Sequence, residues 1–298
     1  MLARLGALAA MSVAHPGAAA APQPIALRPV PRTGEALPVV GLGTWQTFDV
    51  GDAAAERAPL AQVLQGLVAH GGRLVDSSPM YGRAEAVVGE LAAALGLQQA
   101  LFYATKVWTT GRAEGVRQME TSFRRMRVER MDLMQIHNLV DLRAHTATLK
   151  AWKEAGRIRY MGITHYHAGA HDELARLVRT GDYDFVQVNY SLGERAADAR
   201  LLPLARETGT AVIVNRPFVE GSLFRRARGK PLPAWAAEID CTSWAQVFLK
   251  WILGHPAVTC VIPGTGNPKH LADNVNAGRG RMPDAALRAR MLADFERL

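Results

Sequence analysis

Eight short apolar runs recur along this chain, and a segment with helical spacing follows each of them. Each run is rich in Val, Ile, Leu or aromatic residues and ends in a polar or glycine-bearing stretch, as buried strands do. The runs are residues 39–45, 73–78, 101–108, 131–137, 159–166, 185–191, 211–218 and 258–265. Strands that alternate with helices predict a parallel sheet. Eight such repeats predict an α/β fold of the (β/α)₈ TIM-barrel type.

Helices are predicted between the runs from apolar residues at helical intervals and from glycines near the segment ends. The predicted helices are residues 61–70, 84–95, 115–126, 145–155, 168–180, 195–208 and 243–255, with a final helix at 283–298. Pro59 is expected in the first turn of the first helix, where proline is tolerated. The rival fold is an open doubly wound sheet, but no GxGxxG follows the first strand.

The first 38 residues differ in character from the repeats. Residues 25–38 contain a Thr33-Gly34 turn between short apolar pieces, which predicts a hairpin that caps the barrel bottom. We expect residues 25–298 to form one domain. Residues 1–24 are Ala-rich and fit either a secretory signal or a disordered extension. The first reading implies export to the periplasm, and the second leaves the cytoplasm open.

The composition of the chain argues against several classes of binding partner, namely nucleic acid, a membrane and a metal ion. The formal net charge is +8, but no run of five or more Lys and Arg occurs, so we predict no nucleic-acid binding. No other segment reaches ~18 continuous apolar residues, so no membrane span is predicted. The two cysteines, Cys241 and Cys260, indicate neither a disulfide framework nor a zinc site, and no metal is expected. The oligomeric state is open, and we favour a monomer.

Four polar residues stand at the ends of neighbouring predicted strands. Asp76, Lys106 and His137 end three consecutive strands, and Tyr81 follows the first of them in a loop. In a barrel, functional groups collect at the carboxyl ends of strands. A lysine cation lowers the pKa of a nearby tyrosine, a carboxylate keeps the lysine charged, and a neutral histidine can orient a carbonyl. Together they predict an acid that can protonate an alkoxide.

Each of the four residues has a structural alternative when it is taken alone. Asp76 could cap a helix or form a salt bridge with Lys106. Tyr81 could be an aromatic residue at the rim, and His137 could be a hydrogen-bonded core residue. Their joint placement on three consecutive strands favours the catalytic interpretation.

Five segments carry a resemblance to a known family. They are GLGTW (41–45), VDSSPMYGRAEAVVGE (75–90), ATKVW (104–108), DLMQIH (132–137) and IPGT with LADN (262–274). Together they resemble the aldo-keto reductase family, as found in bacteria. The resemblance implies a barrel oxidoreductase that reduces a carbonyl, or oxidises an alcohol, with a nicotinamide cofactor. It implies Tyr81 as general acid/base, Lys106 and Asp76 as its tuning residues, and His137 as the residue that orients the carbonyl.

The last repeat predicts a phosphate site, because barrels bind phosphate after strands seven and eight. Gly264 lets the backbone approach an anion, and a helix N-terminus follows; the alternative is an ordinary turn. The resemblance places Thr265, Lys269, His270 and Asn274 at the adenosine end of the cofactor. The family's usual Lys and Arg for the 2′-phosphate are Gly264 and His270 here. We favour NADPH, with Lys269 as a substitute, and NAD stays open.

The resemblance also implies a nicotinamide end. Thr164 and His165 stand where the family has a Ser-Asn pair, and Gln187 matches its glutamine. The stacking aromatic of the family is Asn215 here, and Arg216 follows it; which of the two faces the cofactor is open, and a rim salt bridge is the alternative for Arg216. The predicted cofactor site also includes Gly43 and Thr44.

The predicted substrate pocket contains Trp45, Trp108 and Asn138, although both tryptophans could simply pack over the barrel mouth. The substrate is expected to be a small aldehyde, ketone, sugar lactol or alcohol. The loop 219–239, with its basic cluster, could cover the cofactor or favour an acidic substrate. Two other functions stay open: a non-catalytic nicotinamide-binding module that senses redox state, as in channel β-subunits, and an unrelated barrel isomerase or lyase acting on a phosphorylated metabolite.

Overall fold

The computed structural model describes residues 23–298, and its centre is a closed barrel of eight parallel strands. The strands are β3 (Leu42–Gly43), β4 (Leu74–Asp76), β5 (Phe102–Val107), β6 (Met131–His137), β7 (Ile158–His165), β8 (Phe185–Asn189), β9 (Ala211–Asn215) and β10 (Val258–Val261). Each pairs in parallel with the next along the chain, and the bridges Val40–Val261 and Gly43–Gly264 join the last to the first. The predicted barrel is confirmed and the open sheet is excluded.

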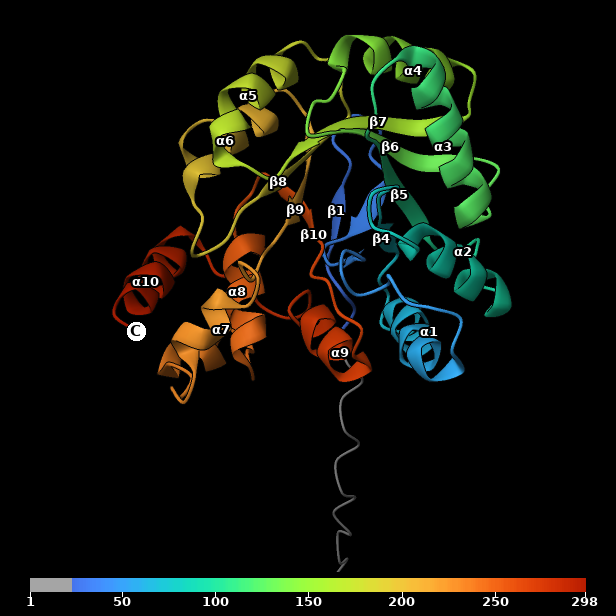
Figure 1. Cartoon of the computed structure of the whole chain (residues 1–298). Coiled ribbons are helices and arrows are strands. Elements are labelled where there is room, and N and C mark those ends of the chain that lie inside the picture. Colours follow the sequence, from blue (N-terminus) through green and yellow to red (C-terminus); the bar gives the residue numbers. More distant parts are fainter. Residues whose placement is uncertain (1–22) are drawn as a thin grey trace, which may run out of the picture.

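Helices form an outer ring around the strands (Figure 1). They are α1 (Ala54–Ala69), α2 (Ala84–Ala94), α3 (Arg112–Met126), α4 (Leu142–Glu154), α5 (His171–Arg179), α6 (Leu201–Glu207), α7 (Ser222–Ala227), α8 (Trp244–Leu253), α9 (Pro268–Asn276) and α10 (Ala285–Glu296). Three 3₁₀ turns, η1 (Ala168–Ala170), η2 (Ala196–Ala199) and η3 (Ala234–Ile239), lie between them. Two predicted helices, 168–180 and 195–208, are therefore each divided into a 3₁₀ turn and an α-helix.

The first helix was predicted too short. It begins at Ala54, so Pro59 lies inside α1 rather than in its first turn. Proline lacks the N–H that would bond to the carbonyl of Ala55. Ala55 is exposed, so water can satisfy that carbonyl and the helix tolerates the interruption.

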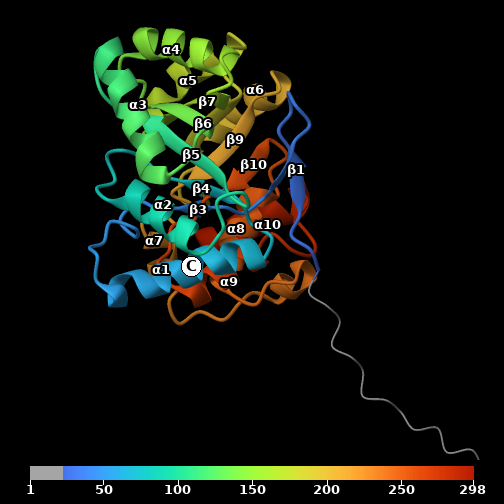
Figure 2. The same ribbon diagram turned by 90° about the vertical axis from the view of Figure 1, so that its right-hand side faces the viewer.

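A hairpin closes the amino-terminal end of the barrel, as predicted. Its strands β1 (Leu27–Pro29) and β2 (Ala36–Pro38) pair antiparallel and lie at one end of the barrel in Figure 2. Val30 and Leu37 are fully buried in the cluster that fills the barrel interior. On the rim, the Tyr160 hydroxyl donates to the Glu35 carboxylate at 2.6 Å. The bottom of the barrel is thereby filled with apolar side chains.

The interior of the barrel changes from apolar side chains near its amino-terminal end to polar side chains at the carboxyl ends of the strands. The interior apolar cluster includes Leu74, Ala104, Leu133, Phe185 and Ile213. Two residues further along the same strands stand Asp76, Lys106, Gln135, Gln187 and Asn215. Because side chains alternate with a period of two, this second set points to the same side as the first. The apolar layer at the bottom thus fixes a polar layer at the carboxyl ends.

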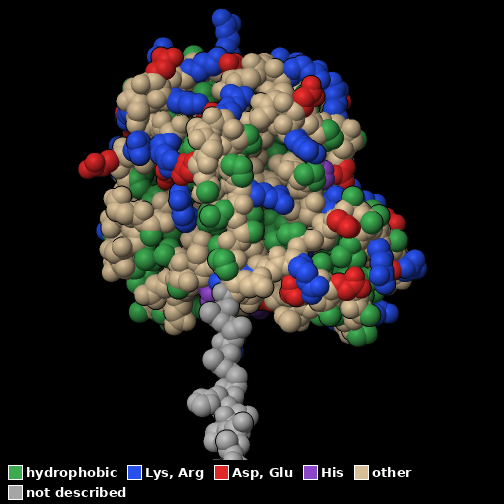
Figure 3. All heavy atoms as spheres, turned by 180° about the vertical axis from the view of Figure 1, so that it is seen from behind, with side chains coloured by type: hydrophobic (Ala, Val, Ile, Leu, Met, Phe, Trp, Pro, Cys, Tyr) green, Lys and Arg blue, Asp and Glu red, His purple; other side chains and the backbone are tan. Residues whose placement is uncertain are grey.

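The surface mixes charges of both signs. On the face shown in Figure 3, Lys and Arg side chains are spread out with Asp and Glu among them. Among residues 23–298, no helix is both long and apolar enough to cross a bilayer. The segment 1–24, predicted to be a signal or an extension, lies outside the described residues except for its last two positions.

The helix that follows Tyr81 is fixed by a close crossing with its neighbour. A Cβ at Gly89 in α2 would lie 2.1 Å from the carbonyl oxygen of Arg125 and 2.7 Å from the backbone of Met126 in α3. No side chain fits in that space. The backbone N–H of Ala84, at the start of α2, donates to the Tyr81 carbonyl at 3.1 Å, so the crossing also supports the loop that carries Tyr81.

Gly89→Ala is expected to destabilise the protein by about 1–3 kcal/mol, the usual cost of overpacking. The direction of the change in unfolding free energy is informative, because Gly→Ala at an uncrowded helix position stabilises a protein by up to about 1 kcal/mol. Urea denaturation measures the difference. Gly66→Ala in α1 is the control, since its Cβ meets only the end of the Leu271 side chain at 3.0 Å. Equal effects of the two substitutions would contradict the crossing argument.

Candidate active site

A cavity of about 670 Å³ opens at the carboxyl ends of the strands. Predicted residues that line it are Gly43, Thr44, Trp45, Asp76, Tyr81, Trp108, His137, Asn138, Thr164, Gln187, Asn215, Arg216 and Gly264. Trp45 and Trp108 are 43% and 41% exposed, so their indole rings face the opening rather than the core. The structure therefore brings most of the predicted site residues to one cavity.

A buried ion pair lies at the base of this cavity. The Lys106 amine donates to the Asp76 carboxylate at 2.6 Å and to the Ser77 carbonyl at 2.7 Å, and both charged side chains are almost completely buried. The other Asp76 oxygen accepts from the amides of Gln135 at 3.1 Å and Gln187 at 3.0 Å. Burial lowers the pKa of Lys106, but Asp76 and Tyr81 outweigh it, so the net pKa is raised and the amine stays charged.

Tyr81 lies directly above the ion pair. The Lys106 Nζ is 5.1 Å from the centroid of the Tyr81 ring. Burial raises the pKa of Tyr81, and the Lys106 cation offsets only part of that rise. The expected net lowering of the tyrosine pKa is therefore wrong, because the loss of water around the phenol outweighs one cation that already pairs with Asp76. At neutral pH the hydroxyl keeps its proton.

His137 completes the base of the cavity. Its ring meets the Tyr81 ring edge-on, with centroids 6.1 Å apart, and lies 6.3 Å from the Trp108 ring. Burial, together with the Lys106 charge and His165, lowers the pKa of His137 to about 3. The imidazole is therefore neutral, as the carbonyl-orienting role requires. Its Nδ1 lies 3.1 Å from the Ser78 hydroxyl.

Two of the residues expected at the nicotinamide end, Thr164 and Gln187, line the cavity. Thr164 donates to the Gln187 carbonyl oxygen at 3.1 Å, so these two residues are joined. His165 Nδ1 accepts from the His167 backbone N–H at 3.0 Å, which leaves Nε2 protonated in the neutral ring. His165 lies beside the cavity rather than among the residues that line it.

Both candidates at the carboxyl end of β9, Asn215 and Arg216, line the cavity. The Asn215 Oδ1 is buried and has no hydrogen-bond partner among residues 23–298, so it can accept from a bound group. Arg216 forms an ion pair with Glu220 at 3.1 Å, and its guanidinium lies 5.8 Å from the Tyr166 ring centroid. The rim salt bridge anticipated for Arg216 is therefore present, and the residue lines the cavity at the same time.

The expected adenosine end lies outside the main cavity. Asn267 caps α9, because its side chain accepts from the Lys269 backbone N–H at 2.9 Å. Lys269 and His270 are exposed on the first turn of the helix, whereas Thr265 and Asn274 are buried. Only Gly264 of this group lines the cavity, so the segment continues the site along the surface.

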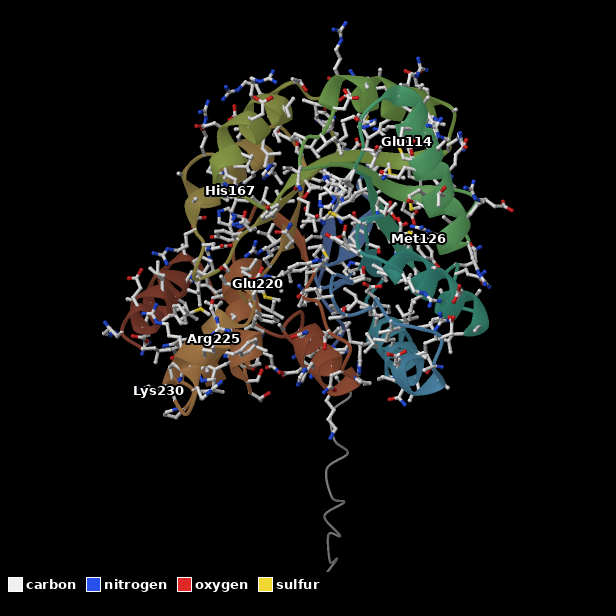
Figure 4. The ribbon with its side chains drawn as sticks, in the orientation of Figure 1. Glu114, Met126, His167, Glu220, Arg225 and Lys230 are labelled. Carbon is white, nitrogen blue, oxygen red and sulfur yellow. The ribbon has the colours of Figure 1, made fainter. Side chains whose placement is uncertain are left out.

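The predicted loop 219–239 is partly helical and divides into two parts. Glu220 and Gly221 line the cavity, but the basic residues that follow do not. Glu220, Arg225 and Lys230 run outward from the barrel in Figure 4. The basic cluster therefore lies outside the cavity lining, and the one charged side chain that this loop adds to the cavity wall is acidic.

Several cavity residues were missed from the sequence. They are Gln46, Thr47, Met80, Tyr166, Pro217, Phe218, Glu220, Gly221 and Ile262, with Gln135 and Ser78 beneath them. A signal existed for Gln135, which stands two residues before His137 on the same strand and so shares its side. The loop residues had no such signal, because their direction depends on backbone turns.

The loop that carries Trp108 is held by Gln118 of α3. The Gln118 side chain accepts from the Trp108 backbone N–H at 2.6 Å and donates to the Trp108 carbonyl at 3.1 Å. His145 bonds the next carbonyl, that of Thr109, at 2.7 Å. These contacts fix the backbone at Trp108, so the indole forms a preorganised wall beside His137.

A family model for the aldo/keto reductase family matches residues 39–289 of this chain. The chain belongs to the aldo/keto reductase family. Membership makes the protein an oxidoreductase of carbonyl groups and removes the unrelated isomerase or lyase barrel as an alternative.

Similarity to individual aldo/keto reductases extends over most of the chain. The reductase is 29% identical over 245 residues to the methylglyoxal reductase YeaE of Escherichia coli (strain K12), covering 80% of this chain and 84% of that protein. It is 25% identical to the NADH-specific methylglyoxal reductase of the same organism, over 86% of this chain and 94% of that protein. A Klebsiella pneumoniae aldo/keto reductase, solved in complex with NADP and acetate, superposes with a TM-score of 0.73 at 25% identity, over 89% of this chain and 92% of that one.

His137 is expected to make the reductase less stable in acid. Its pKa is about 3 in the folded protein and about 6.5 when unfolded, so between these values only the unfolded chain binds a proton there. The free energy of unfolding should therefore fall as the pH falls, by about 2 kcal/mol between pH 7 and pH 5 from this residue. His137→Gln should remove that part of the slope in urea denaturation.

The control is His270→Gln, which removes an exposed histidine on α9. A His137→Gln slope equal to that of the control would show that the burial of His137 carries no proton linkage.

Proposed function

We propose that this aldo/keto reductase reduces the carbonyl group of small aldehydes or ketones with NADPH, and that Tyr81 is the general acid. The observation that carries the proposal is the buried Lys106–Asp76 pair beneath Tyr81, with neutral His137 beside it at the base of an open cavity. The hydroxyl and the imidazole border the same space, where one carbonyl oxygen can contact both.

The roles follow from charge and position. His137 and Tyr81 hold the carbonyl oxygen of the substrate, and Tyr81 gives its proton to that oxygen as negative charge develops. Lys106 stabilises the phenolate that remains, and Asp76 keeps Lys106 charged and in place. A bound nicotinamide cofactor supplies the hydride. Trp45 and Trp108 form apolar walls at the opening, beside the space where the substrate would lie.

The chain offers groups that fit a nicotinamide cofactor. The unpartnered Asn215 Oδ1 can accept from the carboxamide of the cofactor. Gly264 lines the cavity and leads to the N-terminus of α9, where a phosphate is favoured. The NADP complex of the K. pneumoniae relative supports NADPH. The NADH-specific relative from E. coli keeps NADH as the alternative.

The shape of the cavity favours a small substrate with an apolar face. Trp45, Met80, Trp108 and Phe218 are among the apolar side chains that line it, and the Arg216–Glu220 ion pair adds two opposite charges to the lining. The two methylglyoxal reductases among the relatives support short 2-oxoaldehydes as the first substrates to assay.

Tyr81→Phe is expected to lower kcat for aldehyde reduction by about 10²–10⁴-fold, the usual contribution of a general acid. The Kd for NADPH, titrated by fluorescence, should stay nearly unchanged because the substitution removes one hydroxyl and keeps the ring. The loss of absorbance at 340 nm with methylglyoxal and other aldehydes measures turnover.

Tyr183→Phe is the matched control, since the Tyr183 hydroxyl bonds Thr146 of α4 at 2.7 Å, away from the cavity. Equal turnover in Tyr81→Phe and wild type would reject the acid role. NADPH binding without turnover of any aldehyde or alcohol by the wild-type protein would favour the non-catalytic redox-sensing module instead.

Lys269→Ala is expected to weaken NADPH binding about tenfold, or about 1.4 kcal/mol, while NADH binding changes little. Lys269 is exposed on the first turn of α9, and no Arg stands at position 270 to hold a 2′-phosphate in its place. Fluorescence titration of both coenzymes measures the ratio. Lys230→Ala, at the outer tip of the segment after α7, is the control. A parallel loss for both coenzymes would place Lys269 away from the 2′-phosphate.

A further inference from the structure

Ser78 contacts the candidate catalytic histidine from below. It is fully buried, and its hydroxyl oxygen lies 3.1 Å from His137 Nδ1. The other ring nitrogen, Nε2, makes no hydrogen bond to any of residues 23–298, and His137 lines the cavity. One nitrogen is therefore held by the protein, and the other is left for whatever occupies the cavity.

The direction of the Ser78–His137 hydrogen bond follows from a count of donors and acceptors. The Met80 backbone N–H points at the Ser78 oxygen from 3.4 Å, and it can only donate. Across residues 23–298, His137 Nδ1 is the only acceptor within reach of the Ser78 hydroxyl proton. If His137 donated instead, a fully buried hydroxyl proton would have no partner, which costs about 1–3 kcal/mol.

We propose that Ser78 donates to His137 Nδ1 and thereby holds His137 as the tautomer that carries its proton on Nε2. This inference rests on the proposed function, in which His137 orients the substrate carbonyl. In the Nε2–H tautomer the imidazole presents a donor to the carbonyl oxygen. In the other tautomer it would present a lone pair, which repels that oxygen. Ser78 is thus a positioning residue.

Ser78 also links the two groups that face the carbonyl. Its backbone carbonyl accepts from the Tyr81 backbone N–H at 3.0 Å, while its hydroxyl reaches the His137 ring. Burial and the Lys106 charge hold His137 neutral, so one nitrogen must lack a proton and the choice between the two is real. The same residue therefore sets the turn that presents Tyr81 and the tautomer of its neighbour.

Nitrogen-15 NMR of histidine side chains tests the tautomer without any turnover. In the labelled full-length protein, His137→Gln identifies the His137 signals by their loss. We expect wild type and Ser78→Thr to show a protonated Nε2 and a bare Nδ1. Ser78→Ala should convert His137 to the Nδ1–H form or to a mixture. Ser77→Ala, whose hydroxyl bonds Thr44 instead, should leave the His137 signals unchanged.

Two NMR outcomes would overturn the proposal. The first is a protonated Nδ1 in the wild-type protein. The second is an Nε2–H tautomer in Ser78→Ala that is as pure as in wild type, which would mean that the hydroxyl does not set it.

Kinetics then test the consequence. We expect Ser78→Ala to lower kcat for aldehyde reduction about tenfold with an unchanged Kd for NADPH, and Ser78→Thr to restore most of the rate. An unchanged kcat in Ser78→Ala despite an altered tautomer would separate the tautomer from the reaction and refute its role. If wild type reduces no carbonyl at all, the proposed function fails, but the NMR result on Ser78 still stands on its own.

Discussion

The buried ion pair between Asp76 and Lys106 is the interaction on which the site depends. Removing two charged side chains from water costs free energy, and the attraction between the charges alone seldom offsets that desolvation cost. Here the Ser77 carbonyl and the amides of Gln135 and Gln187 bind the remaining polar positions, so each charge is satisfied within the barrel. These groups come from four strands or their ends, and only a closed ring brings them together. The fold is therefore the condition for the chemistry.

Much of this arrangement could be predicted from the sequence, because it follows from two repeating patterns: strands that alternate with helices, and side chains that alternate within each strand. Alternation of apolar runs with helical segments predicted the barrel, and placement at strand ends brought Asp76, Lys106 and His137 together. The period of two within strands also relates Leu74 to Asp76 and Leu133 to Gln135, so the interior side of each strand can be read from its apolar residues. Regular backbone makes such inference reliable.

The rest depends on irregular backbone and on burial, which local patterns do not encode. Arg216, Val219 and Glu220 all have positive φ, a conformation uncommon for such residues, and the path of that loop follows from these turns. Whether the pKa of Tyr81 rises or falls is set by how much water the assembled cavity removes. The role of Ser78 needs the position of one hydroxyl relative to a histidine 59 residues away.

The hairpin at the barrel bottom has a consequence for the catalytic cycle. Val30 and Leu37 of the hairpin pack in one buried apolar cluster with Phe102, Tyr160 and Phe185 of the barrel. If Tyr81 acts as proposed, this apolar filling leaves the cavity at the carboxyl ends as the side from which its phenolate would regain a proton.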